Sequence, residues 1–133
     1  EYGFSEESNI SNEIILKFKP NKPLNSPYKG QLSTDLRIHV MVEINVNDVE
    51  DGFDNIILYQ FVLITSSSLG SYETIRVSQT PEAFFENVSL NELYKIKYRR
   101  KNNVGWSTFS DEVSITPGVV FVSENLKIEL ISV

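Results

Sequence analysis

Basic residues occupy every second position near the end of the chain, at Lys95, Lys97, Arg99 and Lys101. In an extended strand this spacing places all these side chains on one face, while Tyr94, Ile96 and Tyr98 point the other way. The chain's one tryptophan follows at Trp106. Such a row can stack cations on aromatic rings, worth about 0.5–2 kcal/mol per contact. It can also form a patch that binds a polyanion, such as a heparin-like glycan.

Other residues with chemical potential are weaker candidates. The loop at residues 45–55 holds a cluster of oxygen-bearing side chains, among them Asn47, Asp48, Glu50, Asp51 and Asp54. Turn formation at Asp51-Gly52 explains them well, and Val49 stands where a calcium-binding EF-hand loop needs an oxygen ligand. His39 is the only histidine, and no serine lies in a nucleophile-elbow pattern. We therefore expect neither a metal, a cofactor nor an enzymatic activity.

The sequons Asn9-Ile10-Ser11 and Asn87-Val88-Ser89 are candidate N-glycosylation sites. Their use requires passage through a secretory pathway. Asn87 should point outward if Val88 points into a core.

Composition narrows the class of protein. The 133 residues have a net charge of −6 and a pI of about 4.8, which disfavours a nucleic-acid binder. Without any cysteine, the fold must be held by packing and backbone pairing. No apolar run approaches the roughly 18 residues that span a bilayer.

Short runs rich in Val, Ile, Phe and Tyr, separated by turn residues, predict antiparallel strands. We expect them at residues 35–44, 56–65, 72–78, 84–90, 93–101 and 106–117, with a further edge strand within 23–33. In the first run Leu36, Ile38, Val40, Val42 and Ile44 share an apolar face, and His39 lies opposite. The expected fold is all-β, a seven-stranded antiparallel β-sandwich with extra strands at both ends.

The stretch from about Leu24 to Pro117 resembles a fibronectin type III domain. Tyr59 to Leu63 is similar to that family's third strand, and Asn102 to Ser107 to its final hairpin. Val88 and Tyr94 are similar to its corner, where the resemblance implies that the tyrosine hydroxyl closes back on the backbone. The family's tryptophan on the second strand is missing, and Leu90 replaces its corner proline. A seven-stranded immunoglobulin-like relative is the alternative.

The element Trp106-Ser107-Thr108-Phe109-Ser110 is similar to the W-S-x-W-S element of cytokine-receptor modules. That resemblance implies that Lys95, Lys97, Arg99 and Trp106 form a surface ladder of stacked cations and aromatic rings that stiffens the last hairpin. The tip of this hairpin is a possible interaction site, formed by Lys101, Asn102, Asn103 and Val104. Both this tip and the turn at residues 66–71 read as polar and small, which favours a structural role over ligand binding.

The two ends of the chain resemble internal segments. Gly3 to Ser8 is similar to Gly105 to Ser110, and residues 125–130 are similar to residues 35–40. The simplest account is a window from a tandem array. Residues 1–19 would then be the last strand of a preceding module, 20–117 a complete module, and 118–133 the opening strands of the next.

This sequence favours a non-enzymatic structural or adhesive repeat of a secreted or cell-surface glycoprotein. Its expected partners are neighbouring modules or copies of itself, with strand complementation between copies as a route to a filament. Two alternatives remain: a ligand-binding receptor module, and an intracellular scaffold of the same fold.

Overall fold

A computed structural model describes residues 16–44 and 46–120. These residues form seven strands: β1 (Tyr28–Lys29), β2 (Arg37–Met41), β3 (Leu58–Ser67), β4 (Gly70–Ser78), β5 (Glu82–Glu86), β6 (Leu93–Lys101) and β7 (Val113–Ile115). No helix in the described ranges is long and apolar enough to cross a membrane. The expected extra strands at the two ends lie largely outside the described residues.

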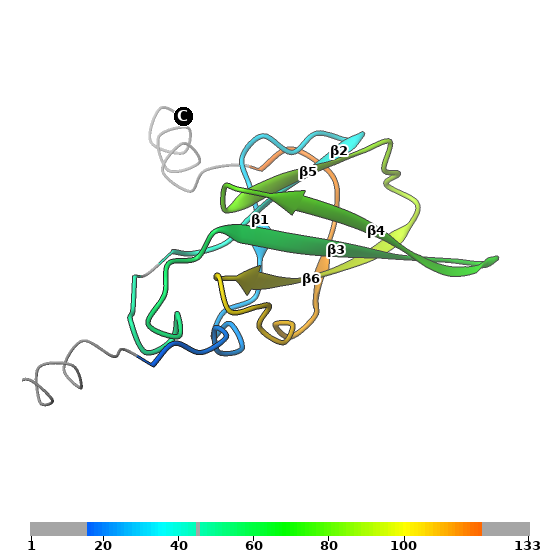
Figure 1. Cartoon of the computed structure of the whole chain (residues 1–133). Helices are drawn as coiled ribbons and strands as arrows, with labels where there is room; N and C mark the ends of the chain where they lie inside the picture. The colour runs from blue at the N-terminus through cyan, green and yellow to red at the C-terminus, as the bar shows by residue number, and fades with distance from the viewer. Residues whose placement is uncertain (1–15, 45, 121–133) are drawn as a thin grey trace, which may run out of the picture.

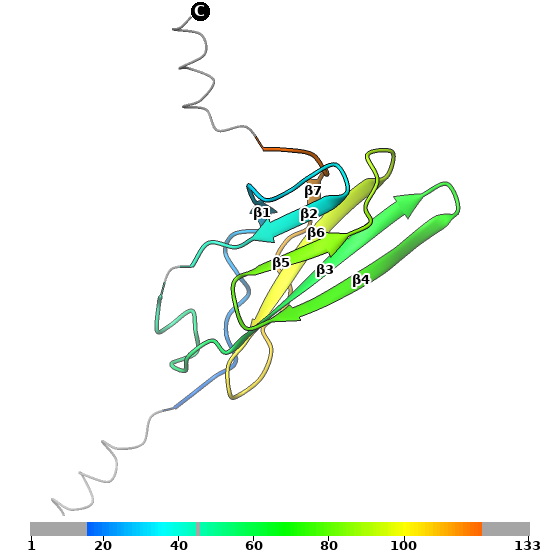
Figure 2. The ribbon, with the colours of Figure 1, turned by 90° about the horizontal axis from the view of Figure 1, so that it is seen from above.

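The strands build two antiparallel sheets that face each other (Figure 1). One sheet has the order β1-β2-β5 and the other the order β4-β3-β6-β7. The hairpin of β3 and β4 is the longest element, and Figure 2 shows it reaching beyond the end of the three-stranded sheet. The structure confirms the expected seven-stranded β-sandwich.

The core fills the space between the sheets. Alternate residues of each strand point inward, and the most deeply buried belong to both layers: Ile38 and Val40 on β2, Phe85 on β5, Phe61 on β3 and Ile96 on β6. These five side chains are at most 1% exposed. Apolar side chains from both sheets therefore share one hydrophobic cluster.

The strand expected at residues 35–44 is shorter than its alternating pattern suggests. Leu36 is 69% exposed and Ile44 is 51% exposed, although both continue the apolar face of the sequence. Leu36 belongs to a turn in which the N–H of Thr34 donates to the carbonyl of Arg37 at 2.9 Å. Pairing of β2 with β5 ends at Met41. The periodicity was right for the strand, but it cannot show where pairing stops.

His39 lies on the face of β2 opposite the core, as expected, and it is nevertheless buried there. It is 3% exposed, and its ring stacks on Phe84 with centroids 4.5 Å apart. The backbone N–H of Leu32 donates to Nδ1 at 3.2 Å, so Nε2 carries the proton donated to Glu82 at 2.6 Å. Residues 30–34 fold over this ring, and a Cβ at Gly30 would lie 2.1 Å from Nδ1. His39 therefore has a structural role.

Candidate functional site

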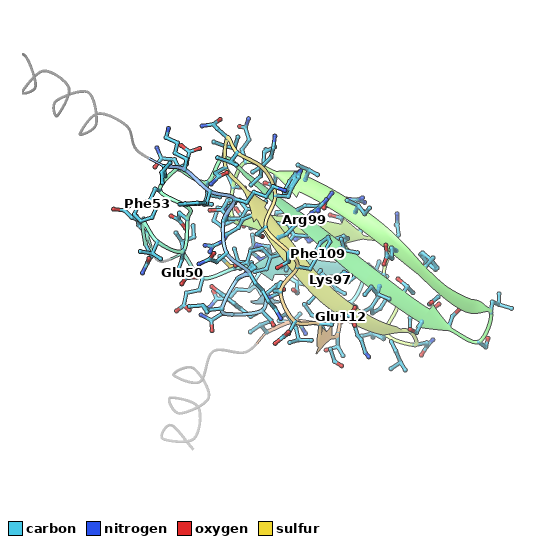
Figure 3. All side chains as sticks on the ribbon, turned by 60° about the horizontal axis from the view of Figure 1, so that its bottom comes forward. Glu50, Phe53, Lys97, Arg99, Phe109 and Glu112 are labelled. Carbon is cyan, nitrogen blue, oxygen red and sulfur yellow. The ribbon has the colours of Figure 1, made fainter. Side chains whose placement is uncertain are left out.

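The outer face of β6 carries a row of alternating cations and aromatic rings. The guanidinium carbon of Arg99 lies 4.7 Å from the ring centroid of Trp106 and 4.7 Å from that of Phe109. The row continues at one end with Lys97, 4.5 Å from Phe109, and at the other with Lys101, 6.0 Å from Trp106. We call this row the cation–aromatic ladder, and Figure 3 shows Arg99, Phe109 and Lys97 within it.

Two serines hold the aromatic stretch against β6. The N–H of Ser107 donates to the carbonyl of Arg100 at 2.8 Å, and its hydroxyl accepts from the N–H of Arg100 at 3.1 Å. Ser110 makes the same pair of bonds with Tyr98, at 2.8 Å and 3.0 Å. The aromatic stretch advances by three residues from Ser107 to Ser110, while β6 advances by only two from Arg100 to Tyr98. Because the two segments are out of step, a regular antiparallel ladder cannot form. The serine hydroxyls therefore accept the bonds that backbone carbonyls would otherwise accept.

Polar partners fix both sides of the ladder. Nε of Arg99 donates to Oε1 of Gln60 on β3 at 2.6 Å, and Lys97 lies 3.9 Å from a carboxylate oxygen of Glu112. Lys95 shares the face of β6, as expected, but no aromatic ring of the described residues lies against it. Its neighbours across the sheet are Ile64 and Ser114. Three of the four basic residues in the row therefore belong to the ladder: Lys97 and Arg99, as expected, and Lys101 in place of Lys95.

Tyr94 closes the connection between β5 and β6. Its hydroxyl oxygen accepts a hydrogen bond from the N–H of Ser89 at 2.7 Å, and the residue is 5% exposed. Val88 is buried at this corner, while Asn87 is exposed with a φ of 59°. Asparagine tolerates this left-handed conformation better than most residues. Asn87 is thus accessible to modification, whereas Asn9 lies outside the described residues.

Asn102 is not a surface residue of the hairpin tip, and its expected role as an interaction residue is wrong. It is 0% exposed. Its Nδ2 donates to the carbonyls of Phe18 at 2.6 Å and Asp51 at 2.9 Å. Its Oδ1 accepts from the N–H groups of Val104 and Gly105. One amide side chain therefore joins the hairpin, residues 47–54 and the start of the described chain.

Arg100 makes a second junction beside Asn102. Its side chain is 13% exposed, and Nη1 donates to the Asp51 carboxylate at 3.1 Å. Nη2 donates to the carbonyl of Glu50 at 2.9 Å and to that of Asn21 at 3.3 Å. We call Asp51, Gly52, Arg100 and Asn102 the clamp. Nothing in the sequence distinguished Arg100 from its basic neighbours except its position on the inward-facing side of β6.

The clamp holds residues 17–21, which we call the entry segment. The N–H of Phe18 donates to the carbonyl of Gly52 at 2.9 Å, and the N–H of Asn21 donates to that of Glu50 at 2.9 Å. Gly52 has a φ of 75°, and a Cβ there would lie 2.1 Å from the carbonyl oxygen of Phe18. Residues before the expected module boundary at position 20 therefore contact the sandwich directly.

The acidic loop contributes structure to this end of the sandwich. Asp54 accepts a hydrogen bond from the N–H of Asn103 at 2.8 Å and lies 3.5 Å from Lys17. The backbone hydrogen bond, assisted by the charge of Lys17, holds the pKa of Asp54 below its ordinary value of 3.8 against the opposing effect of desolvation. Within the described ranges, no group of three or more His, Asp or Glu side chains could hold a metal ion.

Two cavities of about 220 Å³ and 260 Å³ open beside the clamp and are both lined by Glu43, Tyr98 and Arg100. A third, of about 420 Å³, opens beside Asp51 and Asp54. The two smaller cavities fall below the about 300–1,000 Å³ that ligand pockets commonly measure. Burial raises the pKa of the Tyr98 hydroxyl, so it stays neutral well above physiological pH.

The turn between β3 and β4 also departs from expectation. Residues 66–71 read as a polar tip, yet Leu69 is 97% exposed there. The Ser67 hydroxyl accepts from the N–H of Leu69 at 3.3 Å and donates to the carbonyl of Gly70 at 3.2 Å. These local bonds stabilise the turn and leave the leucine in solvent.

Comparisons with known proteins show the fold. No protein-family model and no curated protein sequence matches the chain. Among solved structures, a fourth fibronectin type III domain from human aligns with a TM-score of 0.63 and 15% identity, covering 83% of this chain and 89% of that one. A structure described as a myokine aligns with a TM-score of 0.55 and 12% identity, covering 74% of this chain and 98% of that one.

A third structure places the same fold in a longer protein. The twitchin kinase region from C. elegans aligns with a TM-score of 0.57 and 13% identity, covering 74% of this chain but only 17% of that one. In that protein the matched part is one module among several. The two sheets, the strand order and these alignments lead to one conclusion: the chain has the fibronectin type III fold.

Proposed function

We propose that this chain is a non-enzymatic structural module that spaces and joins neighbouring domains in a longer secreted or surface-displayed protein. The clamped entry segment is the observation that carries the proposal. Phe18, Asn21 and their neighbours precede the first strand, yet backbone bonds and two largely buried side chains fasten them to the sandwich. A domain attached before this segment would meet a fixed junction instead of a free linker.

The composition of the entry region supports the same role. Pro20 and Pro23 are buried, and Lys22 contacts Asp111 at 2.7 Å. Proline restricts the backbone, so a junction of this kind limits bending between modules. The cation–aromatic ladder stiffens the opposite side of β6 in the same way. These features suit a module that keeps a set spacing between its neighbours.

The secreted location rests on the two sequons. Asn87 is exposed and lies on a turn, where a glycan would not disturb the core. Filament formation is a further part of the proposal. The apolar, strand-like runs at the two ends need partner strands, which neighbouring modules or other copies would supply.

The intact mass of the natural protein, measured before and after enzymatic removal of N-glycans, tests this proposal. A mass many times the 15.2 kDa of this chain that falls on deglycosylation would support a secreted multidomain array. A single unmodified species near 15.2 kDa would contradict it.

A further inference from the structure

The basic row on the outer face of β6 differs from most other cations in the described part of the chain. Elsewhere, terminal nitrogens donate to oxygens of the protein, as they do in Lys17, Lys22, Lys29, Arg37, Arg76 and Arg100. In the row, Lys95, Lys97 and Lys101 donate no hydrogen bond to the described residues. Arg99 donates through Nε alone, and Lys97 has one acidic neighbour, Glu112, at 3.9 Å. The charged ends of the row therefore keep most of their donors available.

A fifth cation lies at one end of the row and comes from a distant part of the chain. Lys19 of the entry segment is exposed, and its side chain lies against Gly105, where an added Cβ would come within 3.0 Å of Lys19 Cε. Gly105 precedes Trp106, the ring beside Lys101. The row itself spans about 20 Å, since its four cations stand two residues apart at about 3.3 Å per residue. Folding thus adds a charge at the Lys101 end that the alternating pattern does not show.

The net charge of −6 is not spread evenly over the molecule. Acidic residues crowd the loop at 47–54, where Asp51 pairs with Arg100 and Asp54 with Lys17. Salt screens exposed charges from one another beyond about 8–10 Å. A ligand close to β6 therefore meets the field of the row more than that of the whole chain.

We propose that the outer face of β6 binds a sulfated polysaccharide, which lies along the strand and places its anionic groups on the row formed by Lys95, Lys97, Arg99 and Lys101. Such a polymer repeats its charges at regular intervals, as the row does. The inference goes beyond the proposed function, because it concerns a ligand held on the side of one module and does not depend on how modules are joined.

The packing of the rings favours a polysaccharide over a nucleic acid or an acidic protein. Single-stranded nucleic acids gain much of their affinity by stacking bases on aromatic side chains, and protein partners usually bury aromatic anchors. Here Trp106 and Phe109 each lie against two cations of the row. A ligand on this face therefore meets chiefly ammonium and guanidinium groups. Sulfate oxygens can accept hydrogen bonds from both.

Titration of the full 133-residue chain with a heparin oligosaccharide, as the sulfated probe, tests the proposal. Raising the salt from about 50 mM to about 200 mM should weaken binding at least about tenfold, because several charge contacts are involved. Lys95→Gln/Lys97→Gln should weaken binding about tenfold and reduce its salt dependence. Arg37→Gln/Arg76→Gln is the matched control. It removes the same charge from two other strands, where each arginine also lies over a phenylalanine ring, and it should bind like the wild type.

Lys95→Gln alone separates binding from stability. Since no ring of the described residues lies against Lys95, this variant should bind more weakly and yet unfold at the temperature of the wild type. Circular dichroism would establish that every variant is folded. The proposal is wrong if the probe does not bind at about 50 mM salt, or if the double variant and its control bind equally. It is also wrong if polyglutamate or oligothymidine of equal charge binds as tightly as the sulfated probe. None of these results bears on the clamped entry segment.

Discussion

Arg99 and Arg100 are neighbours on β6 with opposite surroundings. Arg99 lies on the outer face between the rings of Trp106 and Phe109, and its one side-chain hydrogen bond goes to Gln60. Arg100 points to the other side, where the Asp51 carboxylate and the carbonyls of Asn21 and Glu50 accept hydrogen bonds from its guanidinium group. Strand alternation alone separates them. The two residues therefore belong to different sets of contacts that hold the same hairpin: Arg99 to the ladder and Arg100 to the clamp.

The difference lies in what each loss would leave behind. Removing Arg99 exposes two rings that can adjust at the surface. Removing Arg100 leaves the Asp51 carboxylate, 15% exposed, without its cation, and two carbonyls without a donor. A buried charge without its partner is far more costly than a lost surface contact. The clamp should therefore contribute most of the stability at this end of the molecule, and the ladder should contribute less.

Arg100→Ala should have the largest effect. We expect it to lower the free energy of unfolding by about 3 kcal/mol, because Asp51 loses its ion pair in a largely enclosed position. Urea denaturation would measure the loss. Equal losses for Arg100→Ala and Arg99→Ala would remove the distinction between clamp and ladder.

Asn102→Asp should follow. The substitution keeps the shape but replaces a donor with an oxygen facing the carbonyls of Phe18 and Asp51. Unpaired buried polar groups cost about 1–3 kcal/mol each and more when charged, so a loss of at least about 2 kcal/mol is expected. Asn91→Asp, at an exposed position between β5 and β6, introduces the same charge away from the clamp; it is the matched control for chemical denaturation and should change little.

Tyr94→Phe tests the connection between β5 and β6 independently of the clamp and the ladder. It removes only the hydroxyl that accepts from Ser89, so the expected loss is about 1 kcal/mol. Thermal unfolding alongside Tyr28→Phe, at a position that is 50% exposed, would isolate the hydroxyl. If both variants melt like the wild type, the corner hydrogen bond contributes nothing to stability.

Arg99→Ala tests the ladder, with an expected loss of about 1 kcal/mol and an intact core. The single tryptophan is Trp106, so its fluorescence reports directly on the ladder. Its emission should shift to longer wavelength as the ring gains water, whereas Lys95→Ala should leave the spectrum unchanged. Trp106→Ala should likewise loosen the hairpin, and global unfolding of that variant would contradict a surface role.

The smallest effect concerns pH. The pKa of Asp54 is depressed in the folded state, mainly by the Asn103 N–H. The stabilisation that the Asp54 carboxylate gives the folded state is therefore fully present above about pH 3.8, its ordinary pKa. It is lost as the pH falls through the lower pKa of the folded state. Asp54→Asn should reduce stability at neutral pH and flatten the acid side of the stability curve. A parallel offset from the wild type at every pH would contradict this linkage.

Sequence patterns predicted the sandwich and the ladder because both depend on strict alternation. Ile38 and Val40 recur every second residue, as do Lys97 and Arg99, and each set lies on one face. The limits of β2 were not predictable, since Leu36 continues the pattern into a turn. The burial of His39 was not predicted, because no pattern in residues 30–34 indicates that they fold over its ring.

The clamp could not be read from the sequence for a related reason. Asn102 stands in a run typical of a turn, where an asparagine side chain usually bonds to the backbone of its own turn, as Oδ1 does here. Only the arrival of Phe18 and Asp51, 84 and 51 positions away in the chain, makes it a buried junction. Arg100 alternates onto the inward-facing side of β6, but nothing in the sequence shows which groups it meets there. Long-range contacts decide both cases.

Native-state hydrogen exchange at the amides of Phe18 and Asn21 tests the central claim most directly. Both residues precede β1 in the chain, and both amides donate hydrogen bonds to backbone carbonyls of the loop at 47–54. If the clamp fixes the entry segment, these amides should exchange about as slowly as those of β6, and Asn102→Asp should accelerate them far more than Asn91→Asp. Exchange at the rate of an unprotected peptide in the wild type would show that the entry segment is free, and the clamp account would fail.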